Sequence, residues 1–412
     1  MVAAEVEQLL RRLTPRVLGA VVRRYGHFDL AEDATQEALL AAATQWPAEG
    51  IPRDPKAWLI TVAARRLTDL LRAEQARRRR EETVASWALT EMTEPGADAR
   101  RTADTDDTLL VLFLCCHSSL SVASQIALTL RAVGGLSTTE IARALLTSEP
   151  TVTRRITRAK QSIRDSAVPF TQPADEPSRR AAVMRVLYLI FNEGYASTAG
   201  TDLLRADLSE EAIRLTRILH AMLSDDSEVT GLLALMLLIH ARHRARTAPD
   251  GSLIVMAEQD RSLWNRAAIE EGVALIAAAL PRGPIGPYQL QAAIAAVHDE
   301  AVSANTTDWM QIAALYGVLL QLDDGPVVAL NHAVAVSMVA GPPAGLALLQ
   351  ALATDGRLTN SRRFHAVRAH LLERSGDPAA ALTAYESAAR CAANSQQQRY
   401  LQLQIARLQS RG

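Results

Sequence analysis

One predicted helix carries residues with the types and spacing to bind a nucleic-acid backbone. They recur at steps of three, one and three, and are Thr151, Arg154, Arg155 and Arg158. At about 100° per residue these positions gather on one face of a helix. Guanidinium groups neutralise phosphates and can donate two hydrogen bonds to the edge of a guanine. The pattern therefore predicts a DNA-binding surface.

The basic charge is local rather than global. Residues 131–164 contain seven Lys or Arg and two Glu, a net charge of +5, whereas the whole 412-residue chain has a formal net charge of −1. A near-neutral chain has no general attraction to nucleic acid, so any such attraction must come from a region like this one. A solvated amphipathic helix is the structural alternative for the same pattern.

The elements that position these arginines read as a helix-turn-helix. Residues 137–145 form a short predicted helix, and Ser148 is placed to cap the next one. In that second helix the apolar positions, at steps of four, three and four, are Val152, Ile156, Ala159 and Ile163. They predict a buried face opposite the arginines, as a recognition helix requires.

Two further helices are predicted in the first 80 residues. Residues 28–47 form an acidic amphipathic helix whose polar positions include Glu32, Asp33, Gln36 and Glu37. Residues 54–80 form a long basic helix with Trp58 near its start and arginines along its length. Trp58 could hold an unstacked base or pack in the core against Leu39 and Leu40.

Taken together, these segments resemble the extracytoplasmic-function (ECF) sigma factors of bacteria, in the sigma-70 family. Residues 29–47 resemble the region 2 helix that docks on core RNA polymerase, and residues 55–72 resemble the helix that opens and reads the −10 promoter element. Residues 115–164 resemble region 4, whose second helix enters the major groove at the −35 element. The resemblance implies a factor that binds core RNA polymerase and promoter DNA and directs promoter-specific transcription initiation.

The resemblance also implies three sets of contact residues. The −35 element would meet the arginine face described above. The −10 element would meet Trp58, Arg65, Arg66, Asp69 and Arg72, and polymerase would meet Glu32, Asp33, Gln36 and Glu37. Many relatives have Asn four residues before the Asp of the −10 helix, whereas this chain has Arg65 there. Backbone contact would survive this departure, but base choice at −10 would differ.

The fold expected is all-α and modular, since apolar residues recur at three- and four-residue steps and strand-like alternation is hard to find. Two segments rich in polar residues or proline read as linkers. The predicted domains are region 2 (1–80), a linker (81–107), region 4 (108–165), a second linker (166–178), a helical extension (179–320) and tetratricopeptide-like repeats (321–412).

The extension resembles the large C-terminal segment found in one subgroup of ECF sigma factors. Residues 331–352 align with residues 367–388 at an offset of 36, close to the tetratricopeptide period. Such repeats present a groove for a protein or peptide partner, although a plain helical scaffold is the alternative. A polar set within the extension could line a groove for a signal or tie helices together; it comprises Asn192, Glu193, Tyr195 and His298.

Other function classes find little support. His240 and His243 could contribute to a metal site, but no complete ligand set is visible, and no phosphate loop or nucleophile elbow appears. We therefore expect no enzyme activity, no cofactor and no metal. Three cysteines, two of them adjacent, indicate a reduced cytoplasmic setting. The longest apolar run, about ten residues from Leu232, is shorter than the roughly 20 needed to span a membrane.

Two competing classes remain open from the sequence. A stand-alone helix-turn-helix regulator with a ligand- or protein-sensing C-terminal domain would bind its own site without polymerase, and it leaves the region 2 helices unexplained. A scaffold with DNA-like domains would show no salt-dependent affinity for DNA, whereas phosphate contacts make affinity fall steeply with salt.

Overall fold

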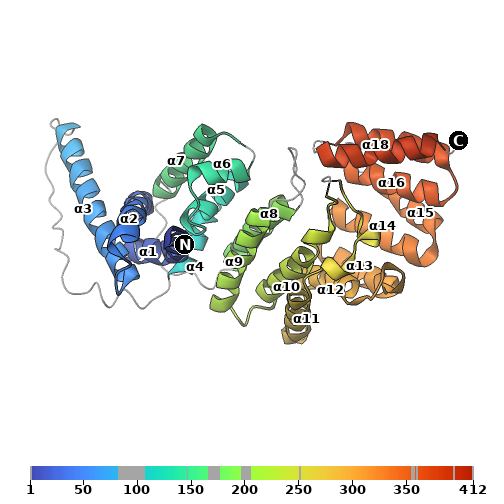
Figure 1. Ribbon diagram of the computed structural model, residues 1–412, viewed down its shortest axis with the longest axis horizontal. Coiled ribbons are helices and arrows are strands. Elements are labelled where there is room, and N and C mark those ends of the chain that lie inside the picture. Colours follow the sequence, from blue (N-terminus) through green and yellow to red (C-terminus); the bar gives the residue numbers. More distant parts are fainter. Residues whose placement is uncertain are drawn as a thin grey trace. The chain divides into compact units, whose positions relative to one another are not determined.

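The computed structural model describes residues 2–81, 107–145, 147–165, 177–195, 206–249, 252–353, 358, 361–392 and 395–410. Within these ranges the chain forms helices and no strand, and an isolated antiparallel bridge joins Thr247 to Leu253. The prediction of an all-α fold is confirmed. The chain divides into two units, Met1–Leu187 and Tyr188–Gly412, each described by itself. The order of helices can be followed in Figure 1.

The first unit holds the two predicted DNA-facing segments. Its helices are α1 (Val2–Tyr25), α2 (Phe28–Glu49), α3 (Pro55–Glu81), α4 (Thr108–Cys115), α5 (Val122–Ala132), α6 (Thr138–Ala144) and α7 (Glu149–Asp165). Helices α1, α2 and α3 pack on one another, and α5, α6 and α7 do the same. The two groups also touch, because α1 contacts α4 and α5 while α2 contacts α7. Helix α8 (Pro177–Tyr195) runs across the boundary between the units.

Local signals in the sequence set where these helices begin. At the start of α6, Glu140 Oε2 accepts a hydrogen bond of 2.7 Å from Ser137 N, and Ser137 Oγ accepts one of 3.2 Å from Glu140 N. This reciprocal pair is a capping box, which satisfies backbone donors that the helix cannot. Before α2, Gly26 and His27 adopt φ values of 66° and 47°. This left-handed pair turns the chain sharply between α1 and α2.

The second unit is built around a helix that is buried on all sides. Its helices are α9 (Ala206–Met222), α10 (Ser227–Ala241), α11 (Arg266–Ala279), α12 (Pro287–Glu300), α13 (Trp309–Leu322), α14 (Pro326–Ala340), α15 (Pro342–Leu352), α16 (Arg362–Arg374), α17 (Pro378–Arg390) and α18 (Ser395–Gln409). Short 3-10 helices join several of them: η3 (His243–Ala245), η4 (Met256–Glu258), η5 (Arg261–Leu263), η6 (Leu280–Arg282) and η7 (Ala304–Thr306).

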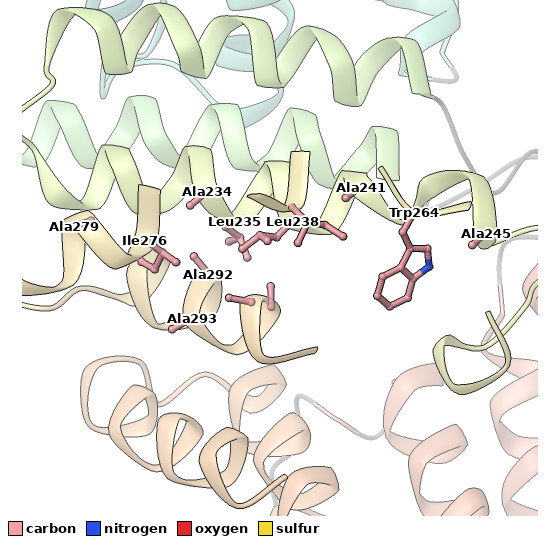
Figure 2. Close-up of a cluster of buried hydrophobic side chains, with 13 residues drawn as sticks. Ala234, Leu235, Leu238, Ala241, Ala245, Trp264, Ile276, Ala279, Ala292 and Ala293 are labelled. Carbon is pink, nitrogen blue, oxygen red and sulfur yellow. The ribbon is translucent and has the colours of Figure 1, made fainter. Parts of the chain in front are cut away.

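Helix α10 contains the longest apolar run of the chain. Leu235 and Leu238 of α10 pack against Ile276 of α11 and Ala292 of α12, in a cluster that Figure 2 shows. A helix that is apolar all round is stable when neighbours cover every side, and α9, α11 and α12 all contact α10. In the described part of the chain, no helix is both long and apolar enough to cross a bilayer.

The last helices form two consecutive hairpins, α14–α15 and α16–α17, followed by α18. In each pair of positions that align at the 36-residue offset, both residues are buried. The pairs are Ala333 and Ala369, Gly345 and Ala381, and Leu349 and Tyr385. A Cβ atom added at Gly345 would lie 2.6 Å from Ser337 Cβ and 2.9 Å from Leu371 Cδ1. The small residue therefore allows α14 and α15 to approach closely. That these hairpins are tetratricopeptide repeats stays a prediction.

Candidate nucleic-acid interface

Helix α7 divides into a buried face and an exposed face, as its sequence predicts. Val152, Ile156, Ala159 and Ile163 are all buried, which confirms the predicted apolar face. Ser148 precedes the helix, and its carbonyl accepts hydrogen bonds from Thr151 N and Val152 N at 3.0 and 3.1 Å. The buried face fixes the rotation of α7, and therefore fixes which side chains point outward.

The opposite face of α7 presents guanidinium groups. Arg154 and Arg158 are exposed, while Thr151 and Arg155 are half-buried. Among the described residues, no carboxylate lies within ion-pair distance of Arg154, Arg155 or Arg158. Arg154 Nε donates a hydrogen bond of 3.3 Å to the carbonyl oxygen of Pro150, in the first turn of the helix. Unpaired arginines on a rigid helix face are suited to phosphates and to guanine edges.

Helix α3 places Trp58 at its start, where a second tryptophan covers it. Asp54 Oδ1 accepts a 2.9 Å hydrogen bond from Ala57 N and so caps this helix. The rings of Trp58 and Trp46 meet edge to face, with centroids 5.4 Å apart. Leu40 is 70% exposed and is therefore not the core residue that the packing alternative for Trp58 expected. Trp58 is half-buried, which leaves part of its ring accessible.

Three predicted −10 residues of α3 share one exposed strip. Arg65, Asp69 and Arg72 are four and three residues apart, and all three are exposed. Asp69 and Arg72 approach each other at 4.0 Å. Arg66 is turned toward α2, where its Nε lies 3.3 Å from Glu37 Oε2. The basic run 77–80 lies in a part of α3 whose side chains are outside the described residues.

The acidic helix α2 is less open than its sequence pattern predicts. Glu37 and Asp33 are exposed and Gln36 is half-buried, but the Glu32 side chain is only 2% exposed. Glu32 Oε1 lies 3.2 Å from Arg131 Nε of α5, and Glu32 Oε2 contacts Lys160 Nζ of α7. Glu32 therefore does not belong to the exposed polar face on which the sequence placed it, because region 4 covers it.

Two further pairs join the same helices. Lys160 Nζ lies 2.6 Å from Asp33 Oδ1, and Arg164 of α7 contacts the buried Asp29 of α2. Sequence reasoning did not select Asp29, Arg131, Lys160 or Arg164 as site residues. A signal was present, since Asp29 and Asp33 are four residues apart, as are Lys160 and Arg164, so each pair lies on one side of its helix.

Two carboxylate partners favour the charged form of Lys160 despite its burial. Burial alone would lower the pKa of Lys160, but the charges and hydrogen bonds of Glu32 and Asp33 outweigh it, and the pKa is raised. Lys160 thus carries its charge at neutral pH, as a buried cation with two carboxylate partners should. A separate ion pair ties α1 to α6, where Arg11 Nη2 lies 2.5 Å from Glu140 Oε1.

The predicted polar set of the second unit lies in two separate places, each beside arginine side chains. The Arg246 guanidinium carbon lies 3.7 Å from the centre of the Tyr195 ring, and Phe191 stacks on the same ring with centroids 5.9 Å apart. Asn192 is half-buried and hydrogen-bonds the Tyr188 side chain. Glu193 is also half-buried. The Arg246 contact ties the end of α8 to the residue that follows η3.

His298 lies at the other place, on α12. Its ring meets Trp309 edge to face at 5.1 Å, and burial, followed by the charges of Arg242 and Arg261, lowers its pKa to about 4. The neighbouring Asp299 is fully buried, with Oδ1 3.5 Å from Arg242 Nε. Within the described ranges, no three His, Cys, Asp or Glu side chains come together as metal ligands.

Three protein families match the chain. The description "Sigma-70 region 2" matches residues 9–78, and "Sigma-70, region 4" matches residues 110–163. A family of unknown function (DUF6596) matches residues 179–280. No solved structure matches the chain.

Individual relatives agree with these families. The chain is 41% identical over 399 residues to "Uncharacterized protein R00370" of Rhizobium meliloti, covering 95% of this chain and 93% of that one. It is 25% identical over 176 residues to "Probable ECF RNA polymerase sigma factor SigI" of Mycobacterium tuberculosis, covering 43% and 59% of the two chains. It is 28% identical over 158 residues to "ECF RNA polymerase sigma factor SigK" of Mycobacterium ulcerans, covering 36% and 79%.

Proposed function

The chain belongs to the ECF sigma factors of the sigma-70 family and carries a C-terminal extension. From this premise we propose which of its residues bind core RNA polymerase and which bind each promoter element during transcription initiation. Sigma factors of this family bind core RNA polymerase and promoter DNA, and the family is not a class of enzymes. We accordingly assign no catalytic residue, metal or cofactor, and we place the protein in the cytoplasm with its partners.

The observation that carries the proposal is the unpaired arginine face of α7. Arg154, Arg155 and Arg158 lie opposite the buried face of the second helix in the region 4 segment. This is the helix that a helix-turn-helix inserts into the major groove. These arginines, with Thr151, would contact the −35 element, some reading guanine and others holding phosphate.

Region 2 would contact the −10 element through α3. The exposed strip of Arg65, Asp69 and Arg72 offers hydrogen-bonding and charged groups along about two turns of the helix. Arg66 lies beside this strip, and the accessible part of the Trp58 ring could stack on a displaced base. Arg65, in place of the Asn of many relatives, would alter the choice of base there.

Core polymerase would bind the acidic face of α2. Glu37, Asp33 and Gln36 are accessible on this face, and negative side chains there would guide approach to a basic surface by complementary charge. Glu32 belongs to the same proposed surface but is covered in this arrangement.

The extension would regulate these activities in cis. Helices α13 and α14 of the extension expose apolar side chains, among them Leu322, Val327 and Val339. A surface of this kind suits a protein or peptide partner. The proposed domain limits are those expected from the sequence, with regulation assigned to residues 179–412.

Run-off transcription with purified core polymerase and pooled genomic promoters tests the function. We expect specific transcripts from the full chain, and their loss when Arg154, Arg155 and Arg158 are replaced by Ala. The control is Arg217→Ala, which removes an arginine that is paired with Glu271 in the second unit. No transcript and no complex with core polymerase on a sizing column would refute the proposal and favour a stand-alone regulator.

A chain ending at Asp165 tests regulation by the extension. A more active truncated chain would show restraint by the extension, and a less active one would show support. Equal activity of both forms would contradict regulation in cis.

A further inference from the structure

Three arginine side chains from separate elements of the second unit act on one another through their charges. They are Arg242 at the end of α10, Arg246 after η3 and Arg363 of α16. Burial is the main cause that lowers the pKa of Arg246, and the like charges of Arg242 and Arg363 lower it further, whereas Tyr195 has an opposing effect. A guanidinium group remains protonated in proteins despite such a shift. The second unit therefore holds three positive charges in one neighbourhood.

The negative charge around these arginines is small. Asp299 Oδ1 lies 3.5 Å from Arg242 Nε. In the described part of the chain, neither Arg246 nor Arg363 has a carboxylate at ion-pair distance, although Arg246 is half-buried. Three cations and one anion leave a net charge of +2. Because a buried charge without a counter-charge is unfavourable, an anion bound at this place would stabilise the fold.

Arg246 is held in a fixed orientation by the end of α8. Its guanidinium carbon lies 3.7 Å from the centre of the Tyr195 ring, and its Nη1 donates a hydrogen bond to the Tyr195 carbonyl oxygen. An arginine that stacks on an aromatic ring keeps the N–H groups at the edge of its plane available for an oxyanion. The side chain is therefore ordered before any ligand arrives, which lowers the entropic cost of binding.

Buried donors beside Arg242 also lack acceptors. Arg242 Nε and Trp264 Nε1 have no hydrogen-bond partner among the residues that the structure describes. The Arg242 side chain is 9% exposed and Trp264 is 3% exposed, and the guanidinium carbon lies 5.9 Å from the Trp264 ring centre. Both Asp299 oxygens lack a hydrogen-bond partner as well, so Asp299 balances the charge of Arg242 without satisfying its Nε–H. Buried polar atoms of this kind normally have a partner.

Two tyrosine hydroxyl groups complete the polar surroundings. Burial raises the pKa of Tyr188 on α8, while a hydrogen bond from Asn192 and the charge of Arg363 lower it. Burial likewise raises the pKa of Tyr316 on α13 to about 12, and the charge of Arg242 opposes this rise. Each hydroxyl is therefore within electrostatic reach of one of the arginines. A phenol can donate a hydrogen bond to an oxyanion.

We propose that these six residues form a binding site for a small polyanion, which they would hold through its phosphate or carboxylate groups. The residues of this arginine site are Arg242, Arg246, Arg363, Tyr188, Tyr195 and Tyr316. Guanidinium groups match the oxygens of phosphate and carboxylate with pairs of parallel hydrogen bonds. A ligand with at least two negative charges would balance the local net charge of +2.

The arginine site joins the beginning of the extension to its last hairpins. Tyr188 and Tyr195 lie on α8, whereas Arg363 lies on α16. A ligand that binds the folded extension and not the unfolded chain stabilises the folded form. The site would thus let a small molecule act on the region that we propose to regulate transcription. The inference rests on the proposed function for this consequence alone, since binding needs neither polymerase nor DNA.

Calorimetric titration of the full chain tests the site, with pyrophosphate and citrate as the two probes. We expect at least one probe to bind at one site per chain and to raise the melting temperature, whereas sodium chloride of equal ionic strength should not. Tighter binding of pyrophosphate would identify a phosphate ligand, and tighter binding of citrate a carboxylate ligand. Arg363→Ala should weaken binding at least about tenfold, because it removes a charged hydrogen-bond donor. Arg363 is exposed, so this variant should keep its fold.

Matched variants separate the arginine site from general attraction to arginine. Arg244 is exposed and lies two positions from both Arg242 and Arg246, so Arg244→Ala should leave the affinity unchanged. Arg246→Lys keeps the charge but loses the paired donors, and it should weaken binding. Replacement of Arg154, Arg155 and Arg158 by Ala should not affect binding, because these residues belong to α7.

Two results would overturn the site. One is no binding of either probe, and the other is an affinity that Arg363→Ala and Arg246→Lys leave unchanged or that Arg244→Ala lowers equally. Run-off transcripts without anion binding would overturn the arginine site and leave the proposed function intact. Anion binding that requires Arg363, without transcripts or a complex with core polymerase, would overturn the proposed function and leave the site intact.

Discussion

The arginine face of α7 makes a quantitative prediction about DNA affinity. Each cation that neutralises a phosphate contributes about 0.9 to the slope of log affinity against log salt concentration on duplex DNA. Arg154, Arg155 and Arg158 have no carboxylate partner among the described residues. On duplex DNA without a −35 element none of them has a guanine to read, so each can neutralise a phosphate and contribute in full. Replacing all three by Ala should reduce the magnitude of the slope by about 2.7.

The effect is large enough to measure directly. For a fourfold rise in salt, the parent chain should lose about fortyfold more affinity than the triple variant, from the same slope difference. Alanine has the highest helix propensity, so the substitutions should leave α7 folded. The assay is fluorescence anisotropy of a labelled duplex of mixed sequence at several salt concentrations, because the phosphate contribution does not depend on sequence.

Single variants locate the effect on the helix. Arg158→Ala should reduce the slope by about 0.9, whereas Arg217→Ala, which removes a paired arginine in the second unit, should not change it. A triple variant with an unchanged slope would refute the assignment of this face to DNA. An equal reduction by Arg217→Ala would show that net charge, rather than the α7 face, sets the affinity.

Three further predictions concern stability and reactivity. Burial raises the pKa of Asp299 to about 6, so its charged form destabilises the fold increasingly as pH rises from about 4 to about 6. The free energy of unfolding of Asp299→Asn relative to the parent chain should therefore rise by about 3 kcal/mol between pH 4 and pH 7.5, as measured by urea unfolding. Comparing the two pH values removes any pH-independent effect of the substitution beside Arg242, and an equal difference at both would contradict this cause. Gly345→Leu should lower the melting temperature and destabilise the fold by at least about 1–3 kcal/mol through overpacking, whereas Gly317→Leu, at a position with open space, should not. In the native protein at pH 8, a thiol reagent should modify Cys391 alone, because Cys115 and Cys116 are buried and burial raises the pKa of both thiols. Modification of all three cysteines would contradict the burial of Cys115 and Cys116.

Much of the first unit follows from local sequence. The four apolar positions of α7 are at three- and four-residue steps, and all four are buried. A helix repeats every 3.6 residues, so spacing alone fixes which residues share a face. The same argument placed Arg154 and Arg158 outside. The family assignment also came from local patterns, since the matching segments keep their own spacing.

The acidic helix α2 shows where this reasoning stops. The pattern separates its polar positions from its alanines, but it cannot tell which polar residues meet solvent and which meet another helix. Glu32 is buried because Arg131 and Lys160, 99 and 128 positions away in the chain, are folded onto it. Trp58 presents the same difficulty, since its ring meets Trp46, while Leu40 is exposed and not part of the core.

The extension shows the same division between local and long-range information. The 36-residue offset predicted equivalent positions, and Gly345 and Ala381 are indeed both buried. The sequence analysis selected His298 as a site residue and did not select its neighbour Asp299. The structure shows that Asp299 is the fully buried carboxylate that pairs with Arg242.

The sequence by itself determined that this chain is helical, where its basic recognition helix lies, and that it is a sigma factor with an added C-terminal region. Those properties depend on spacing within single helices, where each side chain's direction follows from helical geometry. Only the tertiary structure decided that Lys160 and Arg164 turn toward Asp33 and Asp29 while Arg154 and Arg158 stay free. The partner of a charge depends on which helices pack together, and packing is set by the shape and burial of residues far apart in the chain.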